Sequence, residues 1–73
     1  MELSVWDVKT KLTQAVHKAV ADLVVSRVFS DKTPDQRLSK ADLYRLEREL
    51  VELFGKAGEY IYIKIIDGGE ENG

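Results

Sequence analysis

Residues 59–67 read EYIYIKIID, and the period of this stretch decides which fold the sequence predicts. Isoleucines alternate here with Tyr60, Tyr62 and Lys64. A period of two is typical of a β-strand that buries one face and exposes the other. We therefore predict a strand over residues 60–66, with its isoleucines in the core and Tyr60, Tyr62 and Lys64 on the outside.

A capping pattern that occurs twice in the sequence indicates where two helices begin. Ser4 and Ser39 are each followed three residues later by an aspartate, which is the spacing of a capping box. A leucine before each serine is followed by an apolar residue where a hydrophobic staple requires one. We predict amphipathic helices over about residues 5–29 and 40–57. The second helix carries an apolar seam of Leu43, Leu46, Leu50, Leu53 and Ala57.

Residues 23–29, with the sequence LVVSRVF, allow two interpretations because they are rich in β-branched side chains. In the first, the helix continues to Phe29, since no Gly, Pro or Asn interrupts it. In the second, residues 23–29 form a strand that pairs with residues 60–66. We favour the first, which gives a helix-dominated α+β fold. The alternative is an α-β-α-β chain with a two-stranded sheet.

The length of 73 residues predicts one small globular domain over residues 1–67, followed by a flexible, acidic, glycine-rich tail over residues 68–73. We expect Leu46, Leu50 and Leu53 at the centre of the core, in contact with Leu12, Val16 and Ile63. The longest apolar stretch contains charged residues, so we expect no membrane span. The chain also begins without a signal-peptide pattern, so we expect a cytoplasmic location.

Residue types that carry chemistry are scarce in this sequence. There is no cysteine, and His17 is the single histidine, with no carboxylates at metal-ligand spacing beside it. Phosphate loops, nucleotide fingerprints and nucleophile motifs are absent from the sequence. We therefore expect no enzymatic activity, no cofactor and no metal site.

An unpaired strand edge indicates binding, because its N–H and C=O groups need partners. We predict a small non-enzymatic protein–protein interaction module that regulates a larger macromolecular machine through strand 60–66 or an exposed helix face. The partner is another protein or a second copy of the chain. By analogy of size and class alone, phage-encoded inhibitors of host polymerases or nucleases work in this way. The candidate partner-binding residues are Trp6, Arg37, Lys40, Arg45, Arg48, Tyr60, Tyr62 and Lys64.

Trp6 has two interpretations, as a core residue or as an exposed binding anchor, and we favour the core because of its size. The aromatic residues of the strand could stack single-stranded bases, but packing within a sheet is favoured. The alternative function is sequence-specific DNA binding by a transcription regulator that inserts helix 40–57 into the major groove. Nucleic acid is not the favoured partner, because the net charge is −2 and glutamates share that helix.

Overall fold

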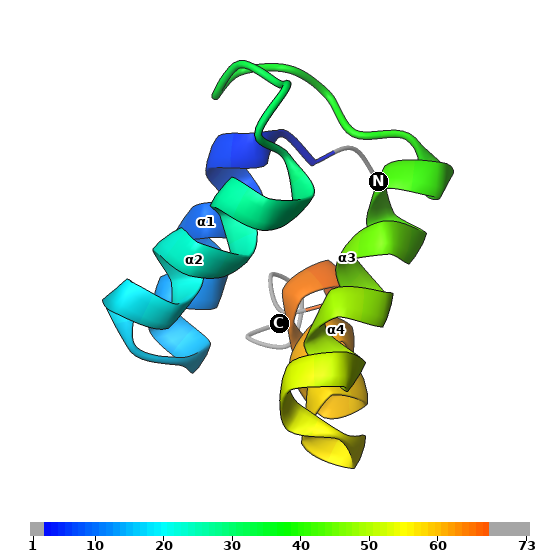
Figure 1. Ribbon diagram of the computed structural model, residues 1–73. Helices are drawn as coiled ribbons and strands as arrows, with labels where there is room; N and C mark the ends of the chain where they lie inside the picture. The colour runs from blue at the N-terminus through cyan, green and yellow to red at the C-terminus, as the bar shows by residue number, and fades with distance from the viewer. Residues whose placement is uncertain (1–2, 68–73) are drawn as a thin grey trace.

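The computed structural model describes residues 3–67, and this part of the chain contains four α-helices and no β-strand (Figure 1). The predicted α+β fold is therefore wrong. So is its alternative, because residues 23–29 and 60–66 are helical apart from Phe29, which ends its helix. The predicted tail over residues 68–73 lies outside the described residues, and the single domain over residues 1–67 stays a prediction. The helices are α1 (Val5–Ala15), α2 (Lys18–Val28), α3 (Lys40–Phe54) and α4 (Lys56–Asp67).

Helix α4 occupies the stretch that alternation predicted to be a strand. A helical spacing of three and four also runs through this stretch, and it joins Gly58, Ile61, Tyr62 and Ile65. Gly58 and Ile65 are buried, and the other two are half-buried against the core. A helix bonds its own backbone groups, whereas a lone strand needs a neighbour that residues 3–67 do not supply. Tertiary packing therefore overrides the β-branched composition.

The predicted helix over residues 5–29 is two helices, because the chain breaks at Val16 and His17. Val16 has extended backbone geometry, with φ −136° and ψ 178°. His17 then caps α2, and its Nδ1 accepts a hydrogen bond of 3.2 Å from the Ala19 N–H. The break lets α2 fold back beside α1 (Figure 1), which buries Ala21 and Val24. No glycine or proline marks this turn, so no helix-breaking residue predicts it.

Both predicted capping boxes are confirmed, and each starts its helix where expected. Ser4 Oγ accepts from the Asp7 N–H at 3.1 Å, and Asp7 Oδ2 accepts from the Ser4 N–H at 3.0 Å. The loop between α2 and α3 also forms backbone hydrogen bonds with the first turn of α1. The Trp6 N–H donates to the Pro34 carbonyl at 2.8 Å, and an isolated antiparallel bridge joins Ser4 to Arg37. These bonds satisfy donors that the first turn of a helix leaves free.

Asp42, in the second capping box, is buried and charged. Its Oδ2 accepts from the Ser39 N–H at 2.9 Å, and its Oδ1 lies 3.5 Å from Lys32 Nζ and from Arg45 Nη1. The Ser39 backbone hydrogen bond is the main cause that lowers the pKa of Asp42; the Ser39 hydroxyl and Lys32 lower it further, and burial opposes them. The carboxylate therefore ties the loop and α3 together in its ionised form.

Helix α3 ends earlier than predicted, at Phe54, because Gly55 turns the chain into α4. Gly55 has φ +63°, in a region that other residues rarely adopt. Three residues later, Gly58 brings α4 against the backbone of α3. A Cβ on Gly58 would overlap the Leu50 carbonyl and lie 2.7 Å from the Val51 nitrogen. The two glycines therefore set a sharp corner and a close approach between α3 and α4.

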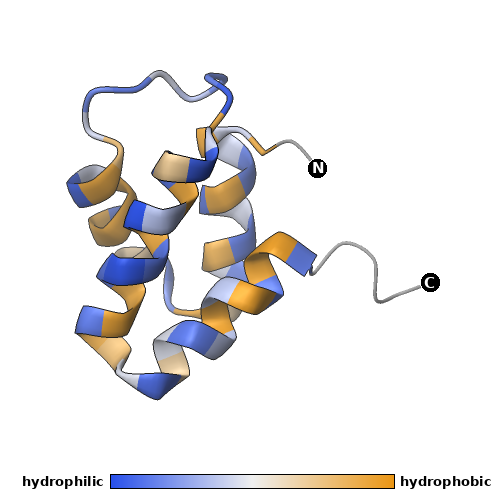
Figure 2. Ribbon diagram, turned by 90° about the vertical axis from the view of Figure 1, so that its right-hand side faces the viewer, coloured by the Kyte–Doolittle hydropathy of each residue, from blue (hydrophilic) through white to orange (hydrophobic). Residues whose placement is uncertain are grey.

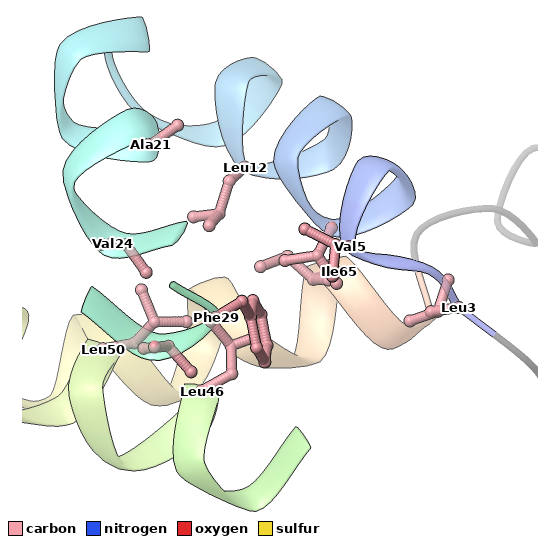
Figure 3. Packing of buried hydrophobic residues seen from close by; sticks show 11 residues of the cluster. Leu3, Val5, Leu12, Ala21, Val24, Phe29, Leu46, Leu50 and Ile65 are labelled. Carbon is pink, nitrogen blue, oxygen red and sulfur yellow. The ribbon is translucent and has the colours of Figure 1, made fainter. Parts of the chain in front are cut away.

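Side chains from all four helices meet in one core (Figure 3). Leu12, Leu46 and Leu50 are fully buried, as predicted, and Val16 is partly buried at the edge of the cluster. The prediction is wrong for Leu53 and Ile63, which are 41% and 51% exposed. Leu53 lies outside because α4 packs against the Leu50 side of α3. Ile63 lies outside because a helix rotates it away from Ile65. The buried apolar residues are Leu3, Val5, Val8, Leu12, Ala21, Val24, Val28, Phe29, Leu46, Leu50 and Ile65.

None of the helices within residues 3–67 combines the length and the apolar character that crossing a membrane requires.

Candidate partner-binding groove

A groove of about 670 Å³ lies between the C-terminal half of α1 and helix α4. Its walls belong to helices that are distant in the sequence but contact each other in the fold. Figure 2 shows hydrophobic residues along much of the C-terminal half of α4. The lining residues are Lys11, Gln14 and Ala15 of α1, and Tyr60, Ile61, Ile63, Lys64 and Asp67 of α4.

The α4 wall carries exposed apolar side chains beside two charged ones. Tyr60 and Ile63 are 63% and 51% exposed, and Ile61 is half-buried between them and the core. Tyr60, Ile63, Lys64 and Asp67 follow a helical spacing of three and four, so they share one face of α4. The core-facing stripe through Ile61 and Ile65 lies beside that face. Helix α4 therefore presents apolar side chains to the core, and both apolar and charged side chains to the groove.

Two lysines border the groove, one on each wall. Lys64 Nζ lies 5.5 Å from the centre of the Tyr60 ring, a cation–π distance. Among residues 3–67, no carboxylate lies within ion-pair distance of Lys11 or Lys64. Asp67 is the single acidic residue of the lining. The groove therefore combines exposed apolar side chains with a rim of two lysines and one aspartate, which is net positive.

A second, smaller hollow of about 250 Å³ lies between α2 and α3, and its arginines are used within the protein. Arg27 Nε lies 2.7 Å from Glu49 Oε2, an ion pair that joins the two helices. Arg45 Nη2 donates to the Val28 carbonyl at 2.7 Å, which caps the end of α2. We interpret this hollow as a structural joint. Its lining residues are Arg27, Val28, Arg45, Arg48, Glu49 and Glu52.

Two of the eight predicted site residues, Tyr60 and Lys64, lie together in the groove. Arg45 and Arg48 lie in the joint, and the Arg48 guanidinium is 6.0 Å from the centre of the Tyr44 ring. Arg37 belongs to the loop before α3.

The remaining predicted residues lie outside both hollows. Lys40 is the exposed first residue of α3. Trp6 is 60% exposed on the first turn of α1, so the favoured core position is wrong. Tyr62 is half-buried, and burial, followed by the charge of Glu47, raises its pKa.

Sequence reasoning missed most of the groove. It placed Ile63 in the core, and it did not single out Lys11 or Asp67. A helical projection of residues 56–67 would have grouped Ile63 and Asp67 with Tyr60 and Lys64. The contribution of α1 carries no sequence signal, because it depends on how two distant helices pack.

No protein-family model, no curated protein and no solved structure matches this chain. Within residues 3–67, no group of three or more histidine or acidic side chains is arranged to hold a metal ion.

Proposed function

We propose that this chain is a small non-enzymatic protein-binding module, and that the groove between α1 and α4 receives apolar side chains of a partner protein. The observation that carries the proposal is the exposure of Tyr60 and Ile63 on the wall of this groove. Aromatic and aliphatic side chains that border a pocket are typical anchors of protein interfaces. Such a module would regulate a larger protein by occupying part of its surface. This is the role predicted from the sequence, and we place it in the cytoplasm.

Direct DNA binding through α3 has less support. Arg45 is held by the Val28 carbonyl and by Asp42, and Arg48 stacks on Tyr44. Moving Arg45 to a phosphate would break a bond that caps α2. An electrophoretic mobility shift at low salt tests this alternative, because phosphate contacts are strongest there.

The proposed function is tested by photo-crosslinking from the groove. Benzoylphenylalanine replaces Tyr60 in the full chain, and the protein is irradiated in extracts of the cells that make it. The matched control carries the same group at Leu23, which is 49% exposed on α2 and outside the groove. We expect one protein to be captured from position 60 and not from position 23.

The captured protein is then purified, and its affinity is measured by calorimetry. We expect Ile63→Ser to weaken binding about tenfold or more, since a central anchor contributes more than 1 kcal/mol. Leu23→Ser should leave the affinity unchanged. Equal capture from both positions, or an unchanged affinity of the Ile63 variant, contradicts the proposal.

A further inference from the structure

We infer that the occupant of the groove between α1 and α4 is an amphipathic helix of a partner protein, with acidic side chains beside its apolar stripe. The inference rests on the proposed function, since it names the partner chemistry of the same groove. Three observations support it: both walls of the groove are helices, two lysines lie at its rim, and the other possible occupants have unsuitable side chains.

A helix fits this groove better than an extended peptide does. Both walls are helices, whose backbone groups are already bonded within α1 and α4, and no strand edge exists within residues 3–67. An extended segment would lose water from its N–H groups without gaining backbone partners. A helix satisfies its own backbone and presents apolar side chains at i, i+3, i+4 and i+7. The strand addition predicted from the sequence therefore has no template in the described part of the chain.

The rim selects for acidic side chains. Lys11 and Lys64 stand on opposite walls, and no carboxylate of residues 3–67 pairs with either of them. Apolar side chains docked between the walls would bring flanking residues of the bound helix toward both lysines. Glutamate or aspartate at these flanking positions gains an ion pair, whereas lysine or arginine meets like charge.

Two other occupants fit less well. Residues 68–73, with the sequence GGEENG, begin where α4 ends, but they contain no apolar side chain to pack against Tyr60 and Ile63. A second copy that docked the same face about a two-fold axis would bring four lysines together with two copies of Asp67. The rim charge therefore favours a different chain with the opposite charge.

The test uses two labelled helical peptides of about 16 residues, long enough for a measurable helix. Both carry the same leucine stripe; one has glutamates beside it and the other has lysines. Fluorescence anisotropy measures their binding to the full chain at low salt. We expect the acidic peptide to bind about tenfold more tightly than the basic peptide, and added salt to reduce this difference. Exchanging both rim lysines, Lys11→Glu with Lys64→Glu, should reverse the order of affinity.

Two matched variants separate the groove from the rest of the surface. Ile63→Ser should abolish binding of the acidic peptide, and Leu23→Ser should retain it. Circular dichroism confirms that both variants keep the helices. Equal affinity for both peptides, or an order that the double lysine variant leaves unchanged, overturns the inference. A dimer in sedimentation that Ile63→Ser dissociates overturns it in favour of a second copy.

The photo-crosslinking result separates this inference from the proposed function. Capture of a protein from position 60 together with equal binding of the two peptides overturns the acidic helix and leaves the protein-binding function standing. Absence of capture and of peptide binding overturns both.

Discussion

Gly58→Ala sets intrinsic helix propensity against the packing of α3 on α4. In a helix, alanine is favoured over glycine by up to about 1 kcal/mol, so propensity alone predicts a more stable protein. The structure predicts the opposite, because the new Cβ overlaps the Leu50 carbonyl and lies 2.7 Å from the Val51 nitrogen. Backbone atoms cannot change rotamer to relieve the overlap, so the two helices must separate. We take the upper end of the overpacking range, about 3 kcal/mol, as the cost of that separation.

The net expectation is a loss of about 2 kcal/mol from the free energy of unfolding. For a domain of this size, that lowers the melting temperature by roughly 8–16 °C. A chain of 73 residues has a total stability of about 4–11 kcal/mol, so the variant should still fold. Thermal and urea unfolding, followed by far-UV circular dichroism, measure the change.

Ala57→Gly is the matched control, because Ala57 is the exposed neighbour of Gly58 in α4. It should cost up to about 1 kcal/mol through propensity alone. One variant replaces glycine with alanine and the other replaces alanine with glycine. Helix propensity alone therefore cannot explain a loss of stability in both. A melting temperature of Gly58→Ala equal to or above that of the wild type would show that α4 does not approach the α3 backbone at this point.

Three further predictions test other parts of the fold. Ile65→Ala should cost about 2–5 kcal/mol in urea unfolding, and Ile63→Ala less than about 0.5 kcal/mol, because the first side chain is buried and the second exposed. Similar costs would favour a strand, in which both side chains share one face. His17→Asp should raise the melting temperature by roughly 2–8 °C, since aspartate is a better N-cap and suits the positive end of α2. A melting temperature below that of the wild type would indicate that the helix is unbroken at this position. The lowered pKa of Asp42 contributes stability that is complete above about pH 4 and lost as the pH falls through the folded-state pKa, so Asp42→Asn should flatten the acid limb of a stability–pH profile. An acid limb that stays as steep in the Asn variant would refute this role.

The candidate groove shows why a site can escape a sequence pattern. Tyr60 and Lys64 were singled out because aromatic and charged side chains were expected on the exposed face of a strand. They are exposed for a different reason, since they share a helical face with Ile63 and Asp67. Arg45 shows the opposite error. It resembled a DNA-contacting residue, but the Val28 carbonyl at 2.7 Å holds it within the protein.

The capping boxes at Ser4 and Ser39 were predictable because all of their hydrogen bonds lie within four residues of the chain. The burial of Leu46 and Leu50 followed from the period of one continuous helix. Alternation in residues 60–66 was compatible with a strand and with a helix, and a strand needed a partner that the fold does not supply. The close approach at Gly58 likewise depends on how α4 packs against Leu50 and Val51 of α3, whereas the break at His17 is a local turn that no glycine or proline marks. Local bonds therefore determined where α1 and α3 begin, whereas long-range packing decided that α4 is a helix and which of its faces stays exposed.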